Sequence, residues 1–253
     1  MSKQQTRKVE VCAYSLESCL AAEEAGADRI ELCASPFEGG TTPPAGMAYL
    51  AVHAVSLPVN VMVRPRGGDF CYDETEFAVM KAEIEAFKAI GVAGIVLGIL
   101  TPEGEIDVAR TRELTELAAP LPVTFHRAID FAVDMEKAVE DVIAAGCRII
   151  LTSGGKDKAP DGAETIARMV AAAAGRIDIM AGSGVSGANA TRLLQTGADA
   201  LHLTGKVDRD SAMAFRKPGI ALGGVPSVPE YAISYTDPAR VRAVVDAVRQ
   251  WPA

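Results

Sequence analysis

Eight short runs rich in β-branched residues recur along this 253-residue chain, and each is followed by a loop and a helical stretch. Most of these runs are apolar on both faces, which is typical of strands in a parallel sheet that helices cover. The runs cover residues 8–14, 29–34, 58–64, 94–100, 122–128, 148–154, 178–184 and 200–205. Eight such units predict an α/β fold, a single (β/α)8 TIM barrel over residues 1–253.

An open doubly wound sheet is the alternative fold. That fold usually carries a glycine-rich loop after its first strand, whereas this chain has YSLES at that place. Capping residues support the helical stretches: Asp73 and Glu76 form a capping-box pattern, and Asp237 precedes Pro238 at the start of the last helix. No shift in composition along the sequence marks a second domain.

Two segments fall outside this regular pattern. Residues 1–7 are polar, and we expect a disordered tail without a secretory signal. Residues 206–236 form a long loop between the last strand and the last helix, and such loops often serve as lids or oligomer contacts. By analogy with other barrels we expect a homo-oligomer, a dimer.

Composition narrows the classes of partner. The chain has 33 acidic and 25 basic residues, a net charge of -8 and no run of Lys and Arg, so we do not expect a nucleic-acid partner. No stretch reaches the roughly 18 apolar residues that would span a bilayer, so we expect a cytoplasmic protein with no membrane partner. Five cysteines without a CxxC motif predict reduced thiols rather than a disulfide framework.

Two of the runs, VEVCAYS (9–15) and IELCASP (30–36), carry a glutamate and, two residues later, a cysteine. Side chains alternate along a strand, so Glu10 and Cys12 face one way, as do Glu31 and Cys33. The other runs also place polar residues on one parity and apolar residues on the other, and we expect the polar parity to face the barrel interior. The remaining inward residues are then Met62, Arg64, Thr124, His126, Thr152, Met180, Gly182, His202 and Thr204. Subject to strand stagger, Glu10 would lie beside Glu31 and Cys12 beside Cys33.

The two inward glutamates need partners, because a buried charge is paired or neutralised. We expect them to pair with the arginines that follow the third strand or to take part in chemistry. A buried ion-pair network with a purely structural role is the alternative.

The loops after the strands favour an anion. Arginine side chains in RPRGGDFCY (64–72) and FHRAID (125–130) suit carboxylate or phosphate oxygens, and the glycine-rich AGSGV (181–185) leads toward a helix that could hold a phosphate. The predicted anion-binding residues are Arg64, Arg66, Arg127, Asp130, Ser153, Gly182, Ser183 and Gly184.

Several of these motifs together identify a family. YSLES, GADRIELCASPFEGGTTP, RPRGGDFCY, FHRAID, LTSGG and MAGSGV occur in this order between about residues 8 and 205, and in this the chain resembles the copper homeostasis protein CutC family. The resemblance implies the same barrel, a cytoplasmic location, copper tolerance and binding of copper(I).

Two functions follow as hypotheses. Copper(I) prefers sulfur ligands, so Cys12 and Cys33 would hold it, with Cys71 as a third ligand; simple packing of small cysteines is the alternative. In an enzyme, Glu10 or Glu31 would act as general base or acid with His126 or His202, on a small phosphorylated or carboxylated substrate. No nucleotide or Schiff-base cofactor is expected, since the sequence has no nucleotide fingerprint and the inward set has no lysine. Whether the protein is an enzyme stays open at this point.

Overall fold

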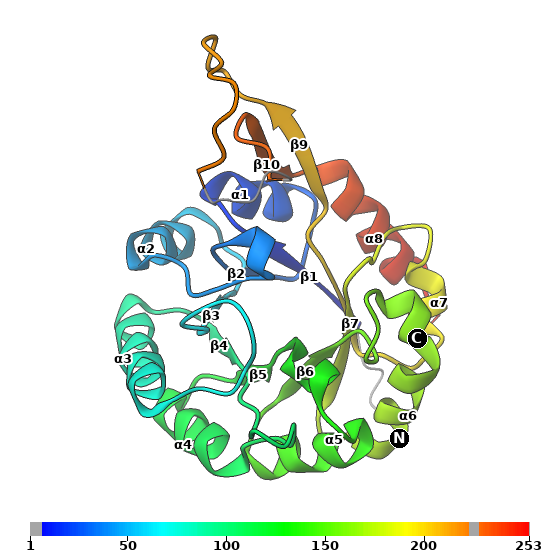
Figure 1. Ribbon diagram of the computed structural model, residues 1–253. Helices are drawn as coiled ribbons and strands as arrows, with labels where there is room; N and C mark the ends of the chain where they lie inside the picture. The colour runs from blue at the N-terminus through cyan, green and yellow to red at the C-terminus, as the bar shows by residue number, and fades with distance from the viewer. Residues whose placement is uncertain (1–6, 223–227, 253) are drawn as a thin grey trace.

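Eight parallel strands close into a barrel in chain order, with helices around the outside (Figure 1). The structure is a computed structural model that describes residues 7–222 and 228–252. The barrel strands are β1 (Lys8–Ala13), β2 (Arg29–Leu32), β3 (Val59–Met62), β4 (Gly94–Leu97), β5 (Val123–Phe125), β6 (Ile149–Thr152), β7 (Asp178–Gly182) and β8 (Ala200–Leu203). The predicted TIM barrel is therefore confirmed.

Each of the strands β1 to β7 is followed by an α-helix before the next barrel strand begins, whereas two further strands lie between β8 and the last helix. The α-helices are α1 (Leu16–Glu24), α2 (Ala45–Ala54), α3 (Glu74–Ile90), α4 (Val108–Ala118), α5 (Met135–Ala144), α6 (Ala163–Ala173), α7 (Ala190–Leu194) and α8 (Pro238–Gln250). Three short 3-10 helices lie in the loops: η1 (Pro36–Glu38), η2 (Arg127–Phe131) and η3 (Ala159–Gly162). Among the helices that the structure describes, none is long and apolar enough to cross a membrane.

Local sequence explains where the helices begin. The Asp73 side chain accepts from the backbone N–H of Glu76, and the Glu76 side chain accepts from that of Asp73, so the predicted capping box is confirmed. Asp237 caps α8 and Pro238 occupies its first turn, as predicted. Gly91 ends α3 with a φ of 88°, a left-handed conformation that glycine adopts without a Cβ penalty.

The two parities of the strands face two different environments. Apolar residues such as Val9, Val11 and Ile30 pack between the sheet and the helices. The opposite parity fills the barrel interior and is mostly polar on β1 and β2. The prediction was wrong on β6, where Leu151 faces inward beside Met180, while the hydroxyl of Thr152 bonds to Asp130 and lies against Met169 of α6. The polar side chain of Thr152 suggested an inward position, but its hydroxyl finds its hydrogen-bond partner, Asp130, outside the barrel interior.

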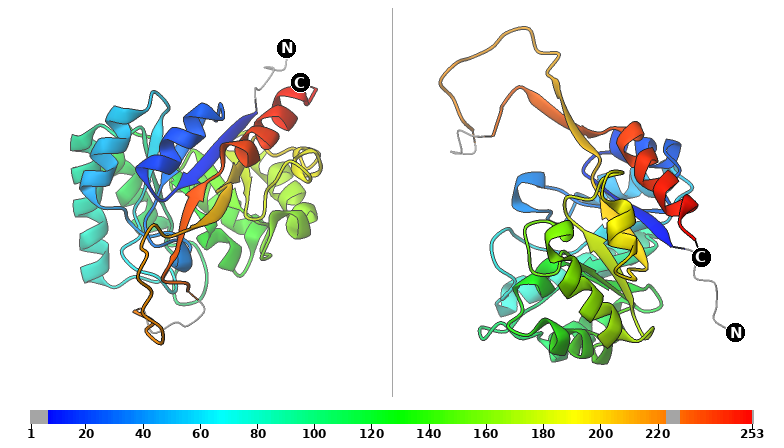
Figure 2. Two further views of the ribbon diagram at one scale, coloured as in Figure 1. Left: turned by 90° about the horizontal axis from the view of Figure 1, so that it is seen from above. Right: turned by 90° about the vertical axis from the view of Figure 1, so that its right-hand side faces the viewer.

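The 206–236 connection contains regular structure, which corrects the expectation of a plain loop. β9 (Lys206–Asp210) pairs antiparallel with β10 (Ala232–Thr236), and the resulting arm extends away from the barrel (Figure 2). Residues 223–227 of this connection and residues 1–6 of the expected tail lie outside the described residues. Arg7, the last residue of that tail, is held in place, because it donates to the carbonyl of Ala198 and stacks over Trp251.

Candidate functional site

The barrel's stagger shifts the two E-x-C motifs by two residues relative to each other. Glu10 is opposite Arg29, and Cys12 is opposite Glu31, in the pairing of β1 with β2. On the other side of β1, Glu10 is opposite His202 of β8. The unstaggered alignment of the two glutamates is therefore wrong, since strands in a barrel tilt and their register shifts around it. The shift gives the two glutamates different neighbours.

Glu10 sits at the centre of what we call the Glu10 network: Glu10, Arg29, Asn60 and His202. It is fully buried, forms an ion pair with Arg29, and lies 2.8 Å from Nδ1 of His202. The amide of Asn60 donates to it at 3.5 Å. Burial alone would raise the pKa of Glu10, but the charges of Arg29 and His202 and their hydrogen bonds lower it to about 2. Glu10 is therefore a permanent, fully paired carboxylate.

We expect from the sequence that these glutamates pair with the arginines after the third strand or take part in chemistry, and the pairing is wrong for Glu10. Its cation is Arg29, at the start of β2. Arg29 and Asn60 could have been found from parity, because each lies two residues before an inward residue on its own strand, Glu31 and Met62. Tyr14 lines the cavity and was also missed. It continues the parity of Cys12 into the loop after β1, so it could have been found in the same way.

Glu31 belongs to a second group, the thiol cluster: Cys12, Cys33 and Glu31. The two sulfur atoms are 3.8 Å apart, and the Cys33 sulfur lies 3.5 Å from Glu31 Oε2, so the one proton of the Cys33 thiol can be donated to either neighbour. Glu31 is 2% exposed, and its Oε1 has no hydrogen-bond partner among the described residues. Burial, together with the neighbouring charges of Cys12 and Glu10, raises the pKa of Glu31 well above its usual value. Glu31 therefore keeps its proton to a higher pH than an ordinary glutamate does.

The two thiols differ in charge. The hydrogen bond from Cys33, aided by the nearby imidazole of His202, holds the pKa of Cys12 well below its usual range. Burial and the adjacent Cys12 raise the pKa of Cys33 well above its usual range. Burial disfavours a charged His202, but Glu31, Cys12 and Glu10 raise its pKa well above the usual value. The directions of these shifts favour the thiolate form at Cys12, the thiol form at Cys33 and the charged form of His202.

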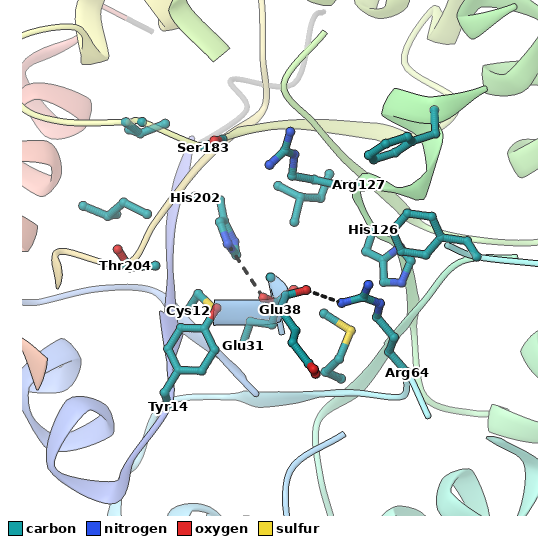
Figure 3. A pocket seen from close by; sticks show the side chains of 18 of the residues that line it. Cys12, Tyr14, Glu31, Glu38, Arg64, His126, Arg127, Ser183, His202 and Thr204 are labelled. Carbon is teal, nitrogen blue, oxygen red and sulfur yellow. Dashed lines mark hydrogen bonds and ion pairs between the residues drawn. The ribbon is translucent and has the colours of Figure 1, made fainter. Parts of the chain in front are cut away.

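Cys12 and Glu31 of the thiol cluster and His202 of the Glu10 network line a cavity of about 560 Å³ at the C-terminal ends of the strands (Figure 3). This is the face where barrels of this kind place their functional sites. Side chains from β1, β2, β5, β8 and η2 converge on it, among them Cys12, Tyr14, Glu31, His126, Arg127 and His202. Met62, from β3, packs beside the two cysteines and also lines the cavity.

Arg64 and Arg66, the predicted anion-binding pair, have separate roles. Arg64 is buried in the cavity wall and donates to the backbone carbonyls of Glu38, Gly40 and Gly68, so it ties together the loops after β2 and β3. Arg66 does not line the cavity. Its guanidinium pairs with Glu76 and Asp69 instead, and these acids satisfy the charge that was predicted to bind an anion.

Arg127, Asp130 and Ser153 form one structural unit. The carboxylate of Asp130 accepts from Arg127 at 2.7 Å, from the Ser153 hydroxyl at 2.8 Å and from the Thr152 hydroxyl at 2.6 Å. Asp130 and Ser153 thus join η2 to the end of β6 rather than facing a ligand. Of the three predicted residues, only Arg127 reaches the cavity.

The Gly182–Gly184 segment differs from a phosphate loop at a helix N-terminus. β7 ends at Gly182, and α7 begins only at Ala190 and has five residues. Ser183 and Gly184 do line the cavity, but the Ser183 hydroxyl donates to the carbonyl of Asp157. The expected contribution of a helix N-terminus is therefore wrong, because an intervening turn separates the glycines from the helix.

The remaining cysteines lie apart from the thiol cluster. Within the described residues, the groups whose ligand atoms are close enough to hold a metal are Cys12–Glu31–Cys33 and Glu10–Glu31–His202. Cys71, the expected third ligand, is in neither group; Glu31 occupies that place. Burial raises the pKa of both Cys19 and Cys147 to about 12, so these two are inert packing thiols.

Comparison with known proteins identifies the family of this chain. The model of the CutC family matches residues 7–207. The chain belongs to the CutC family. A CutC family protein of Chromobacterium violaceum is 44% identical over 241 residues, which cover 95% of this chain and 97% of the relative.

Other CutC relatives extend the likeness to animals and to a solved structure. A human protein named copper homeostasis protein cutC homolog is 44% identical over 237 residues, covering 93% of this chain and 87% of its own. A crystal structure of a CutC protein from Streptococcus agalactiae superposes with a TM-score of 0.74 at 33% identity, over 78% of this chain and 98% of the other. The barrel is thus a shared feature of CutC proteins.

Proposed function

We propose that this CutC family member binds copper(I) at Cys12 and Cys33 and acts in copper homeostasis in the cytoplasm. The observation that carries the proposal is the 3.8 Å separation of the two sulfur atoms beneath an open cavity. Two sulfurs bound to one metal at about 2.3 Å and at a roughly tetrahedral angle are about 3.8 Å apart. The thiols are thus spaced to share one ion without moving.

The surrounding atoms favour a soft cation. Copper(I) prefers thiolate and thioether sulfur, and Met62 packs against both cysteines. Cys12 is already a thiolate, and Glu31 offers an oxygen atom with no hydrogen-bond partner in the described part of the chain. A spacing below the separation of a linear S–Cu–S unit, about 4.6 Å for such bonds, favours a third ligand, and Glu31 or Met62 is placed to supply it.

A chelator competition with copper(I) tests the proposal. Cys12→Ser and Cys33→Ser should each weaken binding about a hundredfold or more, because each removes one of two thiolate ligands. Cys71→Ser is the matched control, since Cys71 lies outside the thiol cluster, and it should bind copper(I) as the wild type does. Unchanged affinity in both Cys12→Ser and Cys33→Ser would exclude the site.

The name of the human relative supports the wider role, and a growth assay separates that role from binding. Cells in which this chain is replaced by Cys12→Ser should tolerate less copper than cells with the wild type or with Cys71→Ser. Equal tolerance in all three strains, together with tight binding by the wild type in vitro, would retain the site and reject the homeostatic role.

A further inference from the structure

The wall of the cavity that faces away from the thiol cluster is built from Arg64, His126 and Phe70. Figure 3 shows Arg64 and His126 on one side of the cavity, with Cys12 and Tyr14 on the other. The guanidinium carbon of Arg64 lies 4.9 Å from the centre of the Phe70 ring, and the ring of His126 lies 5.1 Å from it. Phe70 therefore holds the two basic side chains next to each other.

Each of these two side chains has a buried N–H group that lacks an acceptor. Arg64 is 5% exposed and uses its terminal nitrogens on backbone carbonyls, but its Nε has no partner among the described residues. His126 is 3% exposed, and its Nδ1 accepts from the backbone N–H of Ala128 at 3.2 Å. Burial and the charge of Arg64 lower the pKa of His126 to about 3, so its one ring proton is on Nε2.

That Nε2 of His126 also has no partner within residues 7–222 and 228–252. Leaving a buried donor unpaired is costly, and native structures rarely do so without a ligand or a function to explain it. Both nitrogens have almost no accessible surface in this structure, so an acceptor-rich group in the cavity reaches them when the side chains of this wall shift slightly on binding. Gly98, directly after β4, leaves room for the imidazole, because a Cβ at this position would come within 2.5 Å of the His126 ring.

Arg127 adds a positive charge at the rim of the same cavity. Its Nε donates to Asp130 and its Nη2 to Ser153, which fixes the guanidinium. Its Nη1 makes no hydrogen bond to a described residue and is free for a ligand oxygen. Phe70, Phe131 and Val185 add apolar surface to the lining. The volume of about 560 Å³ is typical of small-molecule sites and far exceeds the space that a single ion needs.

We propose that this cavity binds a small organic oxyanion, a molecule with a carboxylate or phosphate group whose oxygen atoms accept from Arg64 Nε and His126 Nε2 and lie within reach of Arg127. The carbon skeleton of the ligand packs on Phe70 and Phe131. This site is distinct from the copper proposal, because it uses none of the cysteines and either proposal can fail without the other.

Isothermal titration of the full-length, metal-free protein tests this with four probes: inorganic phosphate, pyruvate, 3-phosphoglycerate and neutral glycerol. We expect at least one anion to bind with a millimolar or lower Kd and glycerol not to bind. Comparing phosphate with pyruvate shows whether phosphate or carboxylate is recognised. Failure of all three anions to bind would overturn the proposal.

Variants of His126 assign the binding to this wall. His126→Asn keeps an acceptor near Ala128 but removes the Nε2 donor, and should weaken binding about tenfold to a hundredfold. His126→Gln restores a nitrogen near the Nε2 position and should recover part of the affinity. Arg66→Gln is the control, because Arg66 lies outside the cavity, and it should change nothing. Wild-type affinity in His126→Asn would contradict the proposal.

A measurement on the wild type covers the case in which these variants do not fold. In a nitrogen-15 NMR titration, the Nε2–H signal of His126 should move downfield as the anion binds, because the proton gains an acceptor. An unmoved signal at saturating anion would place the ligand elsewhere and reject the site.

Discussion

Glu10 and Glu31 lie on neighbouring strands of one barrel, point into the same interior and are almost equally buried, yet they are opposite in character. Glu10 has Arg29 and His202 as ionic partners and an amide donor from Asn60, so it stays charged. Glu31 has only a thiol donor and a histidine nitrogen at 3.7 Å, and one of its oxygens is unpaired within the described structure. Glu10 is buried with its charge paired, whereas Glu31 is buried with its charge only partly compensated, which is costly.

Removing the charge of Glu10 should give the largest loss of stability. Glu10→Gln leaves Arg29 and His202 as uncompensated buried cations, which typically costs about 3–5 kcal/mol. Chemical denaturation followed by circular dichroism measures the free energy of unfolding. The control is Glu140→Gln, which breaks an exposed ion pair with Arg176 and should leave the midpoint unchanged. Equal effects of the two substitutions would remove the distinction drawn for Glu10.

Acid should reveal the same network in the wild type. The pKa of Glu10 falls from 4.5 to about 2 on folding. Its contribution, about 3 kcal/mol, is therefore fully present above pH 4.5 and is lost as the pH falls toward 2. Denaturant midpoints measured between pH 6 and 2 should fall more steeply in the wild type than in Glu10→Gln. Parallel curves would show that Glu10 titrates normally.

Glu31→Gln should act in the opposite direction. Because folding raises the pKa of Glu31, the wild type loses stability as the pH rises above the unfolded value, and a neutral glutamine does not. We expect the variant to be more stable than the wild type at neutral pH and similar to it near pH 4.5. Denaturation at the two pH values checks this. A variant less stable than the wild type at neutral pH would show that Glu31 is a paired carboxylate.

Copper(I) affinity should rise with pH. Cys12 is already a thiolate, but the pKa of Cys33 is raised well above its usual range, so the metal must displace the Cys33 proton. Competition titrations should show about a tenfold gain per pH unit below that pKa. Cys33→Ser should lose most of this dependence. A pH-independent affinity in the wild type would mean that both thiols are ionised before the metal binds.

The smallest effect concerns thiol reactivity. Cys12 lines the cavity as a thiolate, whereas burial holds the pKa of Cys19 and Cys147 at about 12. Iodoacetamide followed by peptide mass spectrometry should modify Cys12 at least about ten times faster than either of these two. Unfolded protein, in which the rates should become equal, is the control. Comparable rates in the native state would argue against a thiolate at Cys12.

The sequence predicted the barrel because alternation and helix caps are local signals. The alternation of side chains along each strand predicted six inward-facing residues that lie in or beside the cavity: Glu10, Cys12, Glu31, Cys33, His126 and His202. Their pairing was not predictable in this way, since register depends on how the closed barrel tilts its strands. The same limit hid the role of Arg29.

The arm shows a second limit. Lys206–Asp210 is a polar, exposed segment with no core-facing alternation, and it becomes a strand only by pairing with Ala232–Thr236. Arg66 shows a third limit: an arginine beside a glycine-rich loop suits an anion, but Glu76 of the following helix satisfies it first. Neither outcome is encoded in the local sequence.

The most direct test of the contrast between the two glutamates is a carbon-13 NMR titration of glutamate side-chain carboxyls, assigned with Glu10→Gln and Glu31→Gln. We predict that the Glu10 signal stays at the position of an ionised carboxylate down to about pH 2 and that the Glu31 signal titrates at a higher pH than that of an ordinary glutamate. Two signals that titrate together near the ordinary glutamate pKa would contradict the assignment of a structural carboxylate and a functional one.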